Sequence, residues 1–340
     1  MMSAYGARGR QVGSAEQVAQ FDTEAKLMAG PRHLIGASLA LAFHLAVLPV
    51  AAAEETQEHF RSPLAAVDAA LEAVRADDSD TLSAIFGPDS GAVLSSGDEV
   101  ADRDARERFL EAADVRASIA RETEDRALLS VGEDDWPFPI PLRQGDAGWY
   151  FDTPAGAEEL INRRIGRNEL HAIAALQAFV EAQYEYYTLN PQAAAPPEFA
   201  QRLASSEGKR DGLYWPVGDD EVESPMGPLV AKAVAEGYGK GGDQEGPSPF
   251  HGYLFRLLKA QGPHAPGGAK SYLQDGRLTG GFALVAYPAE YGNSGVMSFM
   301  VNQRDIIFQK DLGEDTRAVA EALEAYDPDN SWEAVDVSDS

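Results

Sequence analysis

Between residues 60 and 152 the spacing of hydrophobic positions changes from a helical period to a strand period. Leu64, Val67, Leu71 and Val74 recur every three or four residues behind Ser62-Pro63, which is a typical helix start, and they predict a first helix. Later positions alternate between apolar and polar, as half-buried strands do. The same reasoning predicts further helices at 80–86 and 103–113 and strands at 115–121, 126–131 and 149–151.

A proline-rich segment, residues 136–142, lies between the last two of these strands. Alternating prolines cannot donate hydrogen bonds to a central ladder. We therefore expect an edge strand or a polyproline-II segment on the surface of the protein.

The longest helical stripe of hydrophobic positions runs through residues 155–189, and Asn190-Pro191 ends it. An irregular stretch at 191–250 follows, with little periodicity beyond 228–235. Beyond it come four predicted strands and a last helix that begins at Asp315, so we expect one long helix packed on an antiparallel meander in two layers. The stripe consists of Ile161, Ile165, Ile173, Leu176, Val180, Tyr184 and Tyr187, and the strands are 252–260, 281–287, 296–302 and 306–309.

These patterns predict an α+β protein with two domains, residues 60–152 and 153–332. Three helices followed by a meander resemble the cone-shaped fold of the nuclear transport factor 2-like superfamily. The later helix and meander, with the strings 168–176 and 292–299, are similar to type IV pilin-like globular domains. A pilin helix follows a prepilin leader directly and is apolar. This helix begins far along the chain and carries several arginines, so the resemblance implies the fold and not a pilus subunit.

Longer strings resemble a bacterial family catalogued as domain of unknown function 2950. They are 96–98 (SGD), 135–142 (DWPFPIPL), 149–153 (WYFDT), 163–170 (RRIGRNEL), 211–216 (DGLYWP), 251–253 (HGY), 280–288 (GGFALVAYP) and 310–313 (KDLG). The resemblance covers about 60–332. It implies an exported protein, and because the family has no assigned activity, it implies no catalytic residues.

The first 53 residues indicate export. Residues 28–53 hold a basic start, an apolar run from Leu34 to Val50 and a closing Ala51-Ala52-Ala53, which together are typical of a signal peptide. The run of 17 residues is short for a membrane-spanning helix; an uncleaved anchor is the alternative. Residues 1–27 are interpreted as an upstream extension from a start codon placed too early. We predict cleavage after Ala53, a periplasmic or secreted soluble protein, and no membrane insertion after cleavage.

Charge and composition exclude several classes of function. The chain carries 55 acidic and 28 basic residues, a net charge of −27, which disfavours nucleic-acid binding and docking to anionic membranes. It has no cysteine, so it has no disulfide, no thiolate metal site and no lipid anchor on cysteine. Histidine pairs with zinc spacing, a complete calcium loop and the usual nucleophile motifs are also missing. We predict no metal and no cofactor.

Arg163, Arg164 and Arg167 place three guanidinium groups within five residues of this acidic chain. Arg163 and Arg167 share a helical face and could grip a carboxylate or a phosphate. Alternatively they pair with acids of the chain, such as Asp152 or Glu158, and fasten the helix to the first domain. The second interpretation is the one we favour from the sequence. We also expect Glu169, on the apolar stripe, to need an arginine partner.

The other candidates are aromatic and carboxylate residues in irregular segments. Tyr214 and Trp215 could stack against a sugar or a peptide, or could pin a loop to a small core. Asp211 and Asp152, assisted by His251, could serve a hydrolase if both carboxylates lined one cleft. Three hypotheses remain: an exported binding or assembly protein without catalysis, whose partner is an envelope protein or a small-molecule or glycan ligand; a carboxylate-dependent hydrolase acting on glycan or peptide; and a structural factor with a pilin-like domain.

Overall fold

The computed structural model describes residues 57–217, 222–236, 238 and 248–336. These residues belong to one compact unit that spans Ala53–Ser340. The predicted signal peptide at 28–53 and the extension at 1–27 lie outside the described residues. No helix within the described ranges is long and apolar enough to cross a membrane.

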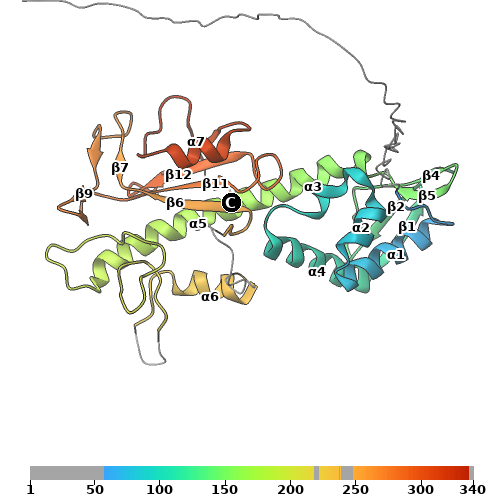
Figure 1. The fold of residues 1–340 in the computed structure, drawn as a ribbon, viewed down its shortest axis with the longest axis horizontal. Helices are drawn as coiled ribbons and strands as arrows, with labels where there is room; N and C mark the ends of the chain where they lie inside the picture. The colour runs from blue at the N-terminus through green and yellow to red at the C-terminus, as the bar shows by residue number, and fades with distance from the viewer. Residues whose placement is uncertain (1–56, 218–221, 237, 239–247, 337–340) are drawn as a thin grey trace, which may run out of the picture. The chain divides into compact units, whose positions relative to one another are not determined.

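The N-terminal part consists of helices followed by an antiparallel sheet, as the change of period predicts (Figure 1). Ser62 caps the first helix, because its Oγ accepts a hydrogen bond of 3.1 Å from the Ala65 N–H. Pro63 occupies the first helical position, where its missing N–H costs nothing. The helices are α1 (Pro63–Ala76), α2 (Ser79–Phe86), α3 (Gly91–Leu94) and α4 (Glu99–Val115), with a 3-10 turn at Pro88–Ser90. The strands are β1 (Ala117–Arg121), β2 (Arg126–Val131), β3 (Trp136–Pro137), β4 (Leu142–Gly145) and β5 (Gly148–Phe151).

The proline-rich segment only partly follows the prediction. β3 pairs with β2 at the side of the main strand path, as an edge strand does. Trp136 and Pro137 are exposed, but Ile140 and Leu142 are completely buried in the N-terminal core, so only the first part of the segment lies on the surface. Proline removes a hydrogen-bond donor without preventing its apolar neighbours from packing, and this is why the prolines alone suggested an exposed path.

The C-terminal part is built on α5 (Ala157–Leu189) and a five-stranded antiparallel sheet, as predicted. The sheet is a meander in the order β14-β13-β12-β11-β6, and α5 packs on β11 and β12. α7 (Thr316–Ala322) covers the other face of β11, so the sheet lies between two helices rather than forming a two-layer domain (Figure 1). For this reason all six residues of β11 are buried. The long strands are β6 (Tyr253–Leu258), β11 (Ala283–Pro288), β12 (Met297–Asn302), β13 (Phe308–Asp311) and β14 (Glu333–Ala334).

Shorter elements complete this part. The periodic stretch predicted near 228–235 is α6 (Gly227–Glu236). Asp315 stands at the start of α7, as predicted, but its side chain makes no capping hydrogen bond. Two small hairpins pair β7 (Ala260–Gln261) with β8 (Lys270–Ser271) and β9 (Leu273–Gln274) with β10 (Arg277–Leu278).

The buried face of α5 differs from the predicted stripe towards the C-terminus. Leu176 and Val180 are buried as predicted, but Tyr184 and Tyr187 are 46% and 37% exposed. The buried positions are instead Asn168, Ala172, Ala175, Leu176, Phe179, Val180, Ala182, Gln183 and Tyr186. A fixed repeat of seven residues drifts around an α-helix by about 20° per heptad, and over a helix this long the drift moves the contact face by one position.

The fold class is therefore α+β, as predicted. Two hydrophobic core clusters are present, one formed by residues up to Leu160 and one by residues from Ala172 onward. The domain boundary at 152/153 and the likeness to nuclear transport factor 2-like and pilin-like folds stay predictions.

Candidate functional site

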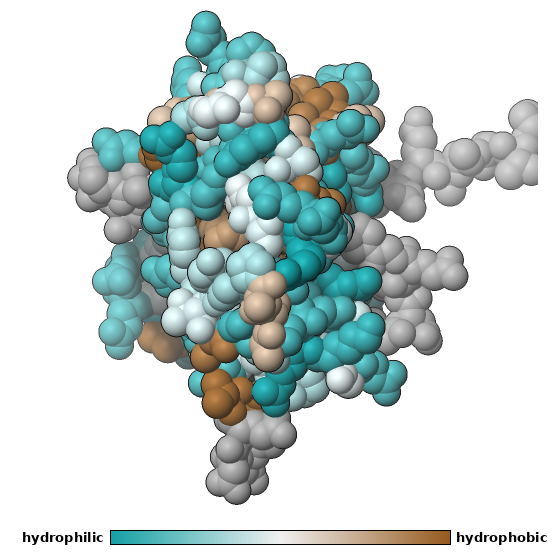
Figure 2. Space-filling view, turned by 90° about the vertical axis from the view of Figure 1, so that its left-hand side faces the viewer, coloured by the Kyte–Doolittle hydropathy of each residue, from teal (hydrophilic) through white to brown (hydrophobic). Residues whose placement is uncertain are grey.

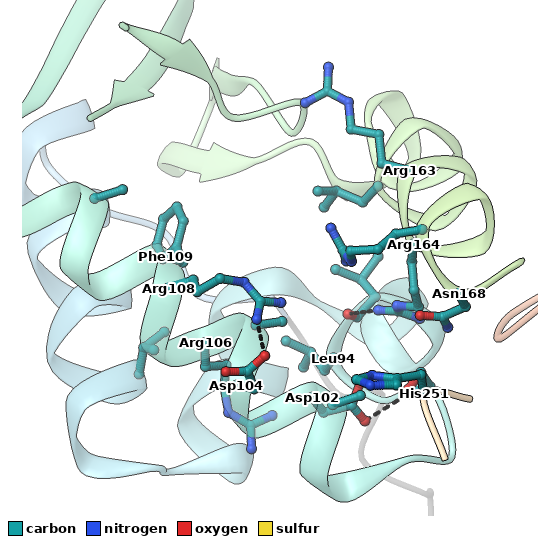
Figure 3. Close-up of a pocket in the computed structure, with 18 of the residues that line it drawn as sticks. Leu94, Asp102, Asp104, Arg106, Arg108, Phe109, Arg163, Arg164, Asn168 and His251 are labelled. Atoms are coloured by element: carbon teal, nitrogen blue, oxygen red, sulfur yellow. Dashed lines mark hydrogen bonds and ion pairs between the residues drawn. The ribbon is translucent and has the colours of Figure 1, made fainter. Parts of the chain in front are cut away.

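A cavity of about 650 Å³ lies among helices α3, α4, α5 and α6. Figure 3 shows α4, with Asp104, Arg106, Arg108 and Phe109, on one side of it, and α5, with Arg163, Arg164 and Asn168, on the other. Most of the apolar lining belongs to the N-terminal core cluster, and α5, α6 and His251 contribute mainly polar side chains. A volume of this size is in the range of small-molecule sites, about 300–1,000 Å³.

Where the cavity borders the N-terminal core cluster, the side chains that line it are apolar. Phe109 of α4 and Phe138 lie against each other with ring centroids 5.4 Å apart, and Phe86 lies 6.2 Å from Phe138. α4 itself is unusually poorly covered: Ala113 is the one residue of its 17 that is buried. The apolar lining comprises Val74, Leu82, Phe86, Val93, Leu94, Ala101, Ala105, Phe109, Ala112, Val131, Phe138 and Leu160, with Trp136 at the edge.

The charge of the cavity is opposite to that of the chain. Its described lining has six cationic side chains and three carboxylates, whereas the whole chain has a net charge of −27. The outer surface is mainly hydrophilic on the face that Figure 2 shows, a view from the end where β9 lies, and apolar residues there form only separate small patches. Arg106 and Arg163 pair with Asp77 and Glu159 outside this lining, and the positive charge that remains favours anions in the cavity. The cations are Arg106, Arg108, Arg163, Arg164, Arg167 and Lys232, and the carboxylates are Asp102, Asp104 and Glu236.

Two of the three α5 arginines have structural partners. Arg163 pairs with Glu159, at 2.6 Å from Nε to Oε1, and its guanidinium lies 5.0 Å from the ring centroid of Trp136. Arg164 donates to the carbonyl oxygens of Ala92 and Val93, at 2.7 Å each, and to Asn293. Arg163 is therefore held by an acid of the chain, although not by Asp152 or Glu158, and Arg164 fastens α5 to α3.

Arg167 contradicts the structural interpretation that the sequence favoured. Within the described part of the chain no hydrogen bond or ion pair joins its side chain to another residue. It lines the cavity, and desolvation, followed by the positive charge of Arg108, lowers the pKa of its guanidinium. Arg108 has its own partner, Asp104, and Arg106 pairs with Asp77 at 3.1 Å. Arg167 is thus a cation that faces the cavity without a compensating carboxylate among the described residues.

Two histidines lie beside Arg167 on the cavity wall. His171 is one helical turn further along α5, and its ring centroid is 4.2 Å from that of His251. Burial, and then the neighbouring His251, lowers the pKa of His171 to about 4, so the ring is neutral at pH 7. Burial also lowers the pKa of His251, although its Nε2 lies 3.3 Å from Oε2 of Glu236.

The backbone at His251 is held in a left-handed conformation, with φ of 48°. Its N–H donates to the Tyr238 hydroxyl at 3.0 Å, and that hydroxyl donates to buried Asp98 at 2.9 Å. The Gly252 N–H donates to the same Asp98 oxygen at 2.8 Å. A strained backbone that is fixed by several hydrogen bonds is common beside functional sites. Asp98, which the sequence analysis had not singled out, therefore positions the His251 segment at the cavity.

The remaining predicted candidates lie elsewhere. Asp152 accepts a hydrogen bond from Arg143 at 3.2 Å, while Asp211 accepts from Ser206 N–H and Oγ at 2.7 Å and 2.9 Å. Neither carboxylate lines the cavity, and their partners have no residue in common. The structure therefore does not bring these two acids together with His251 in this cavity.

The aromatic pair at 214–215 also has a structural role. Trp215 is 4% exposed and belongs to the C-terminal core, with its ring centroid 6.3 Å from that of Tyr186. The Tyr214 backbone pairs with that of Leu203. The alternative interpretation, in which the aromatic side chain anchors its loop to a hydrophobic core, is therefore the one that fits Trp215. The predicted arginine partner of Glu169 is also wrong, because its carboxylate accepts from the backbone N–H groups of Val296 and Met297 at 3.1 Å and 3.0 Å.

The cavity residues of α4 and α6 were missed by the sequence analysis. The repeat of Ala101, Ala105, Phe109 and Ala112 has the spacing of one helix face, and Arg108 is next to it. That spacing was available in the sequence, but it is indistinguishable from an ordinary packing face until the neighbouring elements are known. No group of three or more histidine and carboxylate side chains in the described ranges is placed to hold a metal ion.

The fold and the cavity define an α+β protein with a basic, partly apolar internal site. The chain belongs to the family described as protein of unknown function (DUF2950), whose model matches residues 57–335. No curated protein and no solved structure was found to match the chain.

Proposed function

We propose that this protein is an exported binding protein that takes up a small anionic molecule in the cavity between α4 and α5. The observation that carries the proposal is Arg167, which lines the cavity without a partner among the described residues. Arg167 is exposed, so its guanidinium is accessible to a ligand, and an anion can bind it through charge-assisted hydrogen bonds. Export rests on the signal-peptide pattern of residues 28–53.

The surroundings of Arg167 support an anion at this place. Arg108 adds positive charge, and Lys232 of α6 lines the same cavity, with its ammonium 3.9 Å from Glu236 and largely exposed. The neutral ring of His171 can accept a hydrogen bond from a protonated ligand group, or take up a proton itself when an anion binds beside it. These groups come from three separate helices and converge on one space.

Thermal unfolding tests this proposal. Wild-type protein and Arg167→Gln are melted with and without citrate or phosphate, and Arg317→Gln is the matched control, because it removes the same charge from an exposed pair with Glu321. A ligand at 100 times its Kd stabilises the folded state by about 2.7 kcal/mol. We expect anions to raise the melting temperature of wild type and of Arg317→Gln, and not that of Arg167→Gln. Equal protection of all three proteins, or protection of none, would contradict the proposal.

A further inference from the structure

We propose that the ligand is an amphiphile, a single aliphatic chain that ends in a carboxylate or a similar anionic group. This inference rests on the proposed function and adds the class of ligand. The anionic end would bind at Arg167, and the hydrocarbon part would lie along α4, against the open end of the N-terminal core.

The first observation is the apolar face of α4, which the rest of the protein covers only in part. Ala101, Ala105, Phe109 and Ala112 repeat at spacings of four, four and three residues, so they share one face of the helix. All four line the cavity, and none of them is fully buried. A face of this kind normally packs on another element. Here Phe109 and Ala112 pack in part on the N-terminal core, and the whole face borders a space that a ligand can occupy.

The second observation is the nature of the opposite wall. Leu82 and Phe86 of α2 and Val131 of β2 are at most 7% exposed, yet they line the same cavity. The cavity therefore reaches between side chains of the core and is not a shallow surface depression. Burial against an apolar wall of this type adds nothing to the binding of a compact anion such as phosphate, which would contact only the cationic side chains. A hydrocarbon chain gains free energy by the same burial.

The third observation is that the polar groups of α5 lie across the cavity from the apolar groups of the N-terminal core, although Arg108 of α4 stands beside Phe109. In Figure 3, Arg164 and Asn168 of α5 lie with His251 on one side, and Phe109 lies on the far side of the space. Arg167 is on the α5 side, one turn before His171. A ligand that satisfies both walls must carry an anion at one end and an apolar part at the other. The volume of about 650 Å³ fits one such chain rather than a lipid with several.

Calorimetric titration of a homologous series tests this inference. Acetate, hexanoate, octanoate and decanoate are titrated below their micelle-forming concentrations, with decanol and inorganic phosphate for comparison. Each buried methylene is expected to tighten binding by about fourfold. We expect affinity to rise along the series and decanol to bind more weakly than decanoate. Arg167→Gln should weaken all carboxylates by a similar factor and leave decanol unchanged.

A second variant removes the apolar space without changing charge. Ala105→Phe fills the cavity from α4 and should abolish the dependence on chain length while phosphate still protects through Arg167; circular dichroism verifies that it is folded. The chain-length series measured on wild type tests the inference even if this variant does not fold.

The outcomes separate the two proposals. If phosphate, acetate and decanoate bind equally through Arg167, the amphiphile inference is wrong and the anion site stands. If no anion binds, both are wrong. Binding to anionic lipid vesicles without any binding of free decanoate would also overturn the inference, because it would indicate a membrane surface as the ligand.

Discussion

The contact face of α5 can be tested by comparing substitutions along the helix. Leu176 is completely buried between α5 and the sheet. Truncating a buried leucine to alanine removes its transfer free energy and leaves a cavity, and typically costs about 2–5 kcal/mol. Because Leu176 has no exposure at all, we expect Leu176→Ala to lose about 3 kcal/mol of unfolding free energy. For a chain of this size that corresponds to a fall in Tm of roughly 5 °C.

Two further variants distinguish the structural face from the predicted stripe. Phe179 is completely buried and is absent from the stripe, whereas Tyr184 belongs to the stripe and is 46% exposed. We expect Phe179→Ala to cost about 3–5 kcal/mol and Tyr184→Ala clearly less. Leu170→Ala, at a position 57% exposed on the same helix, is the control and should change stability by less than about 0.5 kcal/mol.

Urea unfolding followed by circular dichroism measures these differences, provided that the slope m is unchanged between variants. A loss below about 0.5 kcal/mol for Leu176→Ala would refute the packing of α5 on the sheet. A larger loss for Tyr184→Ala than for Phe179→Ala would refute the position of the contact face.

Three other measurements address the arginines, the histidines and export. Arg164→Gln should lose about 1.5–3 kcal/mol of unfolding free energy, since it removes charge-assisted hydrogen bonds to the carbonyl oxygens of Ala92 and Val93, while Arg163→Gln should lose less than about 1 kcal/mol; equal losses would contradict the assigned roles. The pKa of His171 is about 4 in the folded protein, against 6.5 for an unperturbed histidine, so the unfolded chain takes up the proton first and stability should fall as the pH drops from 7 to 5. His171→Asn should reduce that fall, and an unchanged pH profile would contradict it. Intact-mass measurement of the exported protein should give Glu54 as the first residue, and a species that retains Leu34–Val50 would contradict cleavage.

The regular elements were predictable because each has a local cause. Ser62-Pro63 starts α1, Asn190 ends α5 in a left-handed conformation, and period-two stretches became β6, β11 and β12. The predictions that failed concern contacts between elements that are distant in sequence. Burial of Ile140 requires the N-terminal core, and the third layer over β11 requires α7 to fold back. The local periodicity of hydrophobic residues does not predict either of these two contacts.

The candidate site was only partly predictable for the same reason. The sequence singled out Arg163, Arg167 and His251, and the structure brings these three to one cavity. It could not show that Arg163 would find Glu159 whereas Arg167 would find no acid among the described residues, since both arginines share a helix face and an acidic background. The apolar half of the cavity arises from a space between elements, and no single segment encodes such a space.

The anion site is tested most directly by observing the Arg167 side chain during binding. In protein labelled with ¹⁵N-arginine, the Nε–H resonance of each arginine is followed by NMR while hexanoate is added, and Arg167→Gln assigns the Arg167 signal. We predict that the Arg167 resonance shifts in a saturable way and that the resonance of Arg317, which pairs with Glu321 outside the cavity, stays in place. An Arg167 resonance that does not move at saturating hexanoate, or that moves no more than that of Arg317, would contradict the account.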